Sequence, residues 1–120
     1  MKVSSKKQKA RLLQQKIVSE ILNLFPELTS NDVRSTPMGV TGADIQLSEK
    51  ARVVHPYSYE CKSHARYAVY KDYEQSQTAA GNLNPILVIK QNNSTPLVIL
   101  SLENWCKLIK ESRHQTESQK

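Results

Sequence analysis

Cysteine is scarce in this sequence, which contains only Cys61 and Cys106. They are too few and too far apart to suggest a disulfide framework, and no CxxC pair or Cys/His cluster offers a zinc site. Long apolar runs are also missing, because no stretch approaches the roughly 18 residues that span a bilayer. The basic first residues lead into an amphipathic segment rather than an apolar signal region. We therefore expect a soluble, membrane-free protein of the cytoplasm.

Acidic residues are outnumbered, 11 against 17 basic ones, so the formal net charge is +6. Such a surplus favours a polyanionic partner such as nucleic acid. The basic residues gather before Glu20, the first acidic residue, and they are Lys2, Lys6, Lys7, Lys9, Arg11 and Lys16. We predict that residues 1–10 form a flexible basic arm. This arm either keeps the protein in solution or contacts phosphates directly.

Hydrophobic spacing predicts the elements of the first half of the chain. A helix is expected from Arg11 to Phe25 and is ended by Pro26. Turn-forming residues between 31 and 41 mark a short strand or loop, and a strand is expected from Ala43 to Leu47. A second, longer strand is predicted from Val53 to Lys62.

In the second half, helical spacing returns from Val69 to Ala80. Two apolar runs, Ile86–Ile89 and Leu97–Leu100, suggest a hairpin. A last helix begins near Ser101, followed by a polar tail over 113–120. It is expected to bury three apolar side chains, those of Trp105, Leu108 and Ile109. The predicted order α-β-β-β-α-β-β-α fits one α/β domain over 11–112 with a mixed β-sheet flanked by helices.

Three polar residues carry the candidate chemistry. Alternate side chains of a strand share one face, so Glu60 and Lys62 point together while Cys61 points to the other side. If the strand from Ala43 to Leu47 lies next to them, Asp44 joins this surface. Two carboxylates and an ammonium group then meet, which is the set that metal-assisted phosphodiester hydrolysis needs.

This trio suits Mg²⁺, with Mn²⁺ as a substitute, because carboxylate and water ligands without imidazole or thiolate are typical of magnesium. Lys62 would orient the attacking water or offset charge on the phosphate. The alternative is that Glu60 and Lys62 are only an exposed ion pair, which is the ordinary role of an E-x-K triplet on a strand.

Several motifs together resemble the PD-(D/E)xK nuclease superfamily, and in particular a group of small phage-type nucleases, over about residues 8–110. The motifs are Asp32-Val33-Arg34-Ser35, Pro37-Met38-Gly39, Gly42-Ala43-Asp44-Ile45, Leu47-Ser48, Ala51-Arg52, Pro56 and Glu60-Cys61-Lys62. The resemblance implies a restriction-endonuclease-like fold.

By this resemblance, Asp44 and Glu60 are the acids of the motif and Lys62 its lysine, although Ala43 stands where a proline often precedes the Asp. The resemblance also implies the backbone carbonyl of Cys61 as a metal ligand. Glu20 corresponds to a glutamate on the first helix that completes the metal site in Holliday-junction resolvases; otherwise it belongs to the polar face of that helix. Gln75 corresponds to a glutamine that supports the active site, or else it is a solvated helix residue.

The remaining candidates would contact DNA. We expect these contacts from Lys7, Lys9, Arg11, Arg34, Ser35, Arg52, Ser63, His64 and Arg66. Arginine contacts to the backbone position DNA without carrying sequence information. Ser63, however, also fits ordinary turn chemistry after a strand, and His64 fits an exposed loop.

Together these features predict a magnesium-dependent DNA endonuclease. Branched DNA such as a Holliday junction is the first expected substrate, because a chain of this length has no separate sequence-reading domain. Two matched cuts imply a homodimer with two-fold symmetry. The alternatives are a site-specific homing or restriction-like endonuclease and a non-catalytic DNA-binding module.

Overall fold

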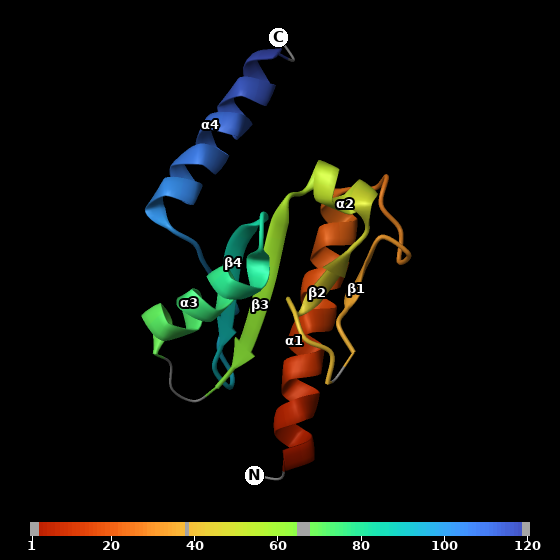
Figure 1. Cartoon of the computed structure of the whole chain (residues 1–120), viewed down its shortest axis with the longest axis vertical. Helices are drawn as coiled ribbons and strands as arrows, with labels where there is room; N and C mark the ends of the chain where they lie inside the picture. The colour runs from red at the N-terminus through yellow and green to blue at the C-terminus, as the bar shows by residue number, and fades with distance from the viewer. Residues whose placement is uncertain (1–2, 38, 65–67, 119–120) are drawn as a thin grey trace.

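Helices and strands alternate along most of the chain in the computed structural model, which describes residues 3–37, 39–64 and 68–118 (Figure 1). Their order is α-β-β-α-β-α-β-β-α. The elements are α1 (Val3–Leu24), β1 (Val33–Ser35), β2 (Ile45–Leu47), α2 (Glu49–Val54), β3 (Tyr57–Ser63), α3 (Val69–Ala80), β4 (Asn84–Lys90), β5 (Leu97–Ile99) and α4 (Leu102–Ser118). The predicted α3 and the predicted β4–β5 hairpin are confirmed, whereas the strand expected over 43–47 is shorter, because it begins at Ile45.

The strands form two sheets. β1 and β2 make an antiparallel hairpin in which Val33 pairs with Leu47. β3 and β4 are parallel, and β5 runs antiparallel to β4, so the second sheet is mixed and has the order β3-β4-β5. The two sheets meet where the Asp44 N–H donates to the Tyr59 carbonyl at 3.0 Å. The predicted single α/β domain with mixed strand pairing and flanking helices is confirmed.

The main core lies between α1, the hairpin and one face of β3. Leu13, Ile17 and Ile21 recur every four residues, so they form one buried stripe of α1. This stripe shares the core with Val33 of β1 and Tyr59 of β3. Figure 1 shows α1 running alongside the hairpin. Burial of this stripe explains why the hairpin, although it has only three residues in each strand, keeps a defined position.

Two predicted flexible segments are helical instead. α1 begins at Val3, so the described part of the 1–10 arm belongs to the first helix rather than to a flexible arm. α4 likewise continues to Ser118, through most of the predicted 113–120 tail. The physical reason is that the first segment is rich in Lys, the second contains Gln and Glu, and neither contains Gly or Pro, so nothing stops a helix that the adjoining residues have already nucleated.

The strand predicted from Val53 to Lys62 is wrong at its beginning, because Val53 and Val54 belong to α2. Ser48 caps this helix, since its hydroxyl accepts a hydrogen bond from the Ala51 N–H at 3.1 Å. The cap outweighs the β-preference of the two valines, and the strand β3 starts only at Tyr57.

Ser48 also joins α2 to the loop that precedes β1, because its hydroxyl donates a hydrogen bond to Asp32 Oδ1 at 2.7 Å. We expect Ser48→Ala to lower the free energy of unfolding by about 1–2 kcal/mol, since it removes the cap of α2. Urea denaturation followed by circular dichroism measures this change. Ser19→Ala, at an exposed position of α1, is the matched control and should change stability by less than about 0.5 kcal/mol. Equal stability of the two variants would contradict the capping role.

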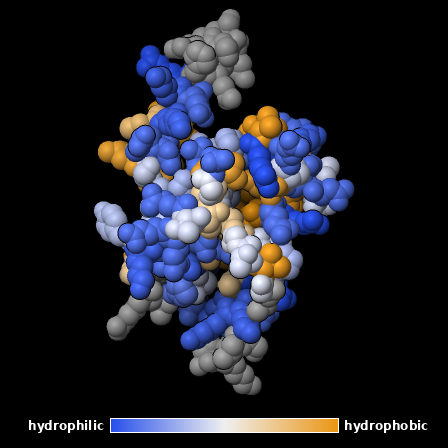
Figure 2. All heavy atoms as spheres, in the orientation of Figure 1, coloured by the Kyte–Doolittle hydropathy of each residue, from blue (hydrophilic) through white to orange (hydrophobic). Residues whose placement is uncertain are grey.

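The last helix is less buried than predicted. Of the three side chains expected to be buried, Trp105 is 49% and Ile109 46% exposed, while Leu108 packs against the main core. The reason is that α4 extends away from the sheets (Figure 1), so that among its described residues Leu108 is the one that packs against the main core. In the same orientation, Figure 2 shows a mostly hydrophilic face interrupted by separate apolar patches. No helix within the described residues combines the length and the apolar character needed to cross a membrane.

Candidate active site

The two faces of β3 have different surroundings. Tyr57, Tyr59 and Cys61 point into the main core, and the alternate residues lie on the opposite face. On that opposite face, the side chains of Glu60 and Lys62 are 15% and 23% exposed. Lys62 Nζ lies 3.9 Å from Glu60 Oε1, which is a loose ion pair. The predicted pairing of an acid and an amine on one face is therefore confirmed.

Asp44 reaches the same place from the end of the β1–β2 hairpin. Its Oδ2 accepts a hydrogen bond from the backbone N–H of Cys61 at 2.7 Å. Its own N–H donates to the Tyr59 carbonyl, and its carbonyl accepts from the Thr36 N–H at 2.8 Å. These bonds hold the Asp44 carboxylate against the backbone of β3, at the residue between Glu60 and Lys62.

The pKa values of both carboxyl groups are raised. Burial raises the pKa of Glu60 to about 7; Asp44 and Asp72 add to this increase, while Lys62 opposes it. Burial also raises the pKa of Asp44, against the opposing effects of the Cys61 N–H and of Lys62. Lys62 does not fully offset the cost of keeping these two partly buried carboxyl groups ionised. A bound cation would supply the missing positive charge.

The donors present suit a hard divalent cation. Asp44 and Glu60 contribute carboxylate oxygens, which Mg²⁺ prefers. Cys61 does not offer a thiolate, because its side chain faces the core and burial raises the pKa of its thiol. Within the described residues, no group of three or more His, Cys, Asp or Glu side chains is arranged around a metal position. Two protein carboxylates with several waters is a common arrangement for Mg²⁺.

The first helix contributes Gln14, rather than Glu20, to the hollow beside Asp44. Glu20 is exposed and is not part of a ligand group with Asp44 and Glu60. Gln14 instead lines a hollow of about 500 Å³ that Asp44 also lines. The two positions are six apart along the chain, which places them about 120° apart around the helix. Sequence reasoning missed Gln14, although it follows Lys7 and Arg11 at helical spacing, and these two residues line the same hollow.

The third helix borders the site on the other side. Gln75 lines a hollow that also includes Glu60, Gly42 and Lys71. Gln75 therefore lies beside Glu60, and its supporting role stays a prediction. Lys71 was not predicted. Its only signal in the sequence is that it lies one turn before Gln75 on the same helix.

Other predicted contacts are spread over the surface. Lys9 and Ser63 line a separate hollow with Lys16 and Lys90, and Lys9 Nζ donates to Asn92 Oδ1 at 2.9 Å. Arg34 and Arg52 are exposed and border a further hollow on the outer side of the hairpin. Ser35 lines the hollow that Asp44 lines, and His64 is exposed just after β3. Arg66 lies outside the described residues.

His55 belongs to the core rather than to the site. Its ring packs against Phe25, Tyr57 and Tyr59, and its Nε2 lies 2.7 Å from the Tyr59 hydroxyl. Burial lowers the pKa of His55 to about 4, so the ring is neutral at pH 7.

This shift predicts a loss of stability in acid. The ordinary pKa of 6.5 applies to the unfolded chain, so between pH 6.5 and about 4 the unfolded His55 binds a proton that the folded one does not. The stability that the neutral ring contributes above pH 6.5 is therefore lost as the pH falls through this range. We expect urea unfolding at pH 7.5 and 4.5 to show a loss about 2 kcal/mol larger in the wild type than in His55→Gln.

Glu60 works in the opposite direction, because its raised pKa favours the folded state at low pH. Its contribution is common to both proteins and cancels in the comparison. Equal losses in the wild type and His55→Gln would contradict a buried neutral His55.

The chain is thus an α/β domain with mixed strand pairing, and two acids and a lysine meet between its hairpin and β3. Comparisons of the chain with family models, with curated proteins and with solved structures find no match.

Proposed function

We propose that the protein is a magnesium-dependent DNA endonuclease of the PD-(D/E)xK type, with Asp44, Glu60 and Lys62 at its active site. The observation that carries this proposal is the 2.7 Å hydrogen bond from the Cys61 N–H to Asp44 Oδ2. It brings a carboxylate from the hairpin to the place where Glu60 and Lys62 stand side by side on β3. Separate segments thus contribute the acid pair and the amine.

Each residue has a distinct role in the proposed reaction. Asp44 and Glu60, with the Cys61 carbonyl, would hold Mg²⁺, which supplies Lewis acidity toward the phosphate and a lowered pKa for water. The Lys62 ammonium group offsets negative charge that develops on the phosphate oxygens. Gln75, beside Glu60, is suited to orient water through its side-chain amide. Water attack on phosphorus and release of the 3′ oxygen leave a 5′-phosphate end.

The surroundings of the site suit a polyanion. Lys7 and Arg11 of α1 flank it on the side of Asp44, and Lys71 of α3 flanks it on the side of Glu60. Basic groups on two sides of a paired-acid site favour the approach of a phosphate backbone to carboxylates that would otherwise repel it.

Branched DNA is the proposed substrate, cut by a homodimer as in Holliday-junction resolution. The test incubates the protein with a four-way junction, a linear duplex and single-stranded DNA, in Mg²⁺, in Mn²⁺ and in EDTA. We expect paired nicks at the junction with either metal and no cleavage in EDTA. Size-exclusion chromatography with light scattering measures the oligomeric state.

The control variants make this test specific. Glu60→Gln removes one charge from the site and should abolish cleavage, whereas Glu103→Gln, at an exposed position of α4, should cut like the wild type. A single discrete cut in a long duplex would support a site-specific homing or restriction-like endonuclease instead. If the folded wild type binds DNA but cuts none of these substrates under any of these conditions, the result would support the non-catalytic DNA-binding module.

A further inference from the structure

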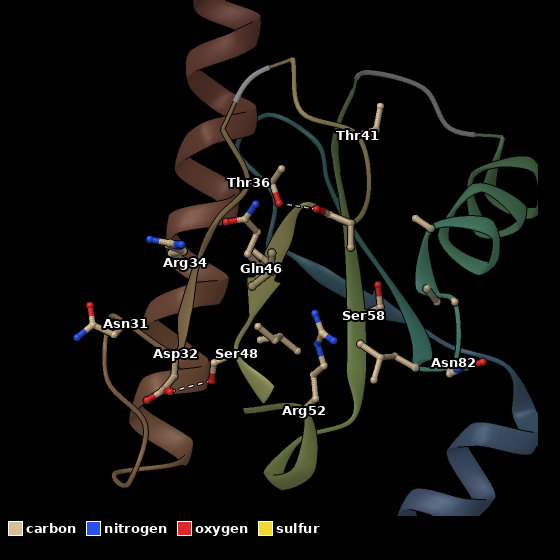
Figure 3. Close-up of a pocket in the computed structure, with 17 residues that line it drawn as sticks. Asn31, Asp32, Arg34, Thr36, Thr41, Gln46, Ser48, Arg52, Ser58 and Asn82 are labelled. Atoms are coloured by element: carbon tan, nitrogen blue, oxygen red, sulfur yellow. Dashed lines mark hydrogen bonds between the residues drawn. The ribbon is translucent and has the colours of Figure 1, made fainter. Parts of the chain in front are cut away.

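A polar hollow lies on the outer side of the hairpin, opposite α1 (Figure 3). Its volume is about 740 Å³, and it is bounded by β1 and β2, by β3 and by the end of α3 with the residues that follow. Gln46, Arg52, Ser58 and Asn82 line it with polar groups. Figure 3 shows the Arg52 guanidinium directed into the hollow, between Gln46 and Ser58, whereas the Arg34 side chain points away from its centre.

The hollow lies next to the candidate active site. Ser58 lines it, and Glu60 lies two residues further along the same face of β3, a distance of about 7 Å along the strand. Ala79 of α3 borders both this hollow and the one that contains Glu60 and Gln75. The spacing from Ser58 to Glu60 is of the same order as that between successive phosphates of a DNA strand. A strand held at Glu60 would therefore run on into the hollow.

The charges in the hollow suit a phosphate group. The Arg52 guanidinium makes no hydrogen bond or ion pair with any residue that the structure describes. Asp32 is the only acid among the described lining residues. Its carboxylate already accepts hydrogen bonds from the Thr29 N–H and the Ser48 hydroxyl, so it does not engage Arg52. A positive group that points into a hollow and has no partner among the described residues is available to bind an anion.

The volume of the hollow and its uncharged polar lining groups suit one or two nucleotides. A volume of about 740 Å³ lies in the range of sites for small molecules and is far too small for a duplex. The amides of Gln46 and Asn82 each offer a donor and an acceptor, the pair of groups that meets the edge of a base. Because the hollow is too small for a duplex, a base that enters it and meets these amides is not paired with another strand.

We propose that this hollow holds an unpaired nucleotide directly next to the phosphate that is cut, with Arg52 on its phosphate and Gln46 on its base. The inference rests on the proposed endonuclease function and gives it a substrate class, namely DNA with unpaired nucleotides beside the cleavage point. Bulges and single-stranded segments provide such nucleotides without the cost of opening a duplex, whereas a fully paired four-way junction must open a pair at its branch point.

Binding without cleavage tests this assignment. Fluorescence anisotropy in EDTA measures the affinity for a labelled duplex and for the same duplex with a short central bulge. The wild type should bind the bulged DNA at least about tenfold more tightly than the paired duplex. Arg52→Ala should weaken binding of the bulged DNA about tenfold and reduce its salt dependence by about one phosphate contact. Gln46→Ala should reduce the preference for the bulge, while Lys107→Ala, which removes an exposed charge on α4, should leave both affinities unchanged.

Thermal unfolding confirms that each variant is folded, and Gln46→Ala serves as the second test if Arg52→Ala does not fold. Equal affinity of the wild type for both DNAs would overturn the proposal, as would a full preference for the bulge in the folded Arg52→Ala and Gln46→Ala variants. Because EDTA prevents cleavage, the outcome does not depend on catalysis. The two proposals can fail separately. If the protein prefers the bulged DNA through Arg52 but never cuts DNA with Mg²⁺, the endonuclease function is contradicted and the nucleotide site is supported.

Discussion

Asp44→Asn is expected to slow magnesium-dependent DNA cleavage at least about a thousandfold, because it removes one of the two charged ligands that the proposed metal site has. The asparagine oxygen can still accept the hydrogen bond that Asp44 Oδ2 takes from the Cys61 N–H. The substitution therefore changes charge with little change of shape. Single-turnover cleavage of a four-way junction in Mg²⁺ measures the effect.

Stability should respond in the opposite direction. Burial raises the pKa of Asp44, so the folded protein holds this carboxylate at a cost that the neutral amide avoids. Asp44→Asn should thus be at least as resistant to urea as the wild type at pH 7. A variant that is folded and cuts within a few-fold of the wild-type rate would show that Asp44 is not a metal ligand.

Leu87→Ala is expected to cost about 3 kcal/mol of folding free energy, with a range of about 2–5 kcal/mol. Leu87 is fully buried at the centre of the mixed sheet, between its partners Glu60 on β3 and Ile99 on β5. Truncation leaves a cavity in a place where two neighbouring strands limit relaxation. Urea denaturation measures the loss.

Val53→Ala is the matched control, because Val53 is 80% exposed on α2. This variant should differ from the wild type by less than about 0.5 kcal/mol. If Leu87→Ala were as stable as Val53→Ala, the sheet would not be packed as described. Because Leu87 pairs with Glu60, the variant also tests how far a rigid β4 is needed to position the acid.

Some features of the site followed from local spacing. The two-residue period of a strand is enough to place Glu60 with Lys62 and to send Cys61 to the core. Gln75 could be placed beside the acids only through a family resemblance, because position on a helix does not say which face meets the sheet. Lys71 and Gln14 escaped detection for the same reason, since each becomes part of the site only when α3 and α1 are packed.

Errors in the predicted fold came from competition between local signals. The valines of α2 favour a strand, but the Ser48 cap and its bond to Asp32 favour a helix, and the helix wins. The basic first residues suggested a flexible arm, because charge is visible in a sequence while the support that α1 gains from its buried stripe is not. Trp105 was expected to be buried from its character alone, yet α4 touches the core along another edge.

The amino-acid sequence by itself determined the positive charge, the single α/β domain, the alternation of β3 and the helix that ends before Gly81, because each depends on composition or on neighbours along the chain. Only the tertiary structure decided that Asp44 meets the backbone of β3 at Cys61, that Gln14 rather than Glu20 lines the hollow beside it, and that Arg52 points into a hollow next to the one that Glu60 lines. These contacts join segments that are distant in sequence. Their geometry depends on how the hairpin and the helices pack against β3, which no local pattern encodes.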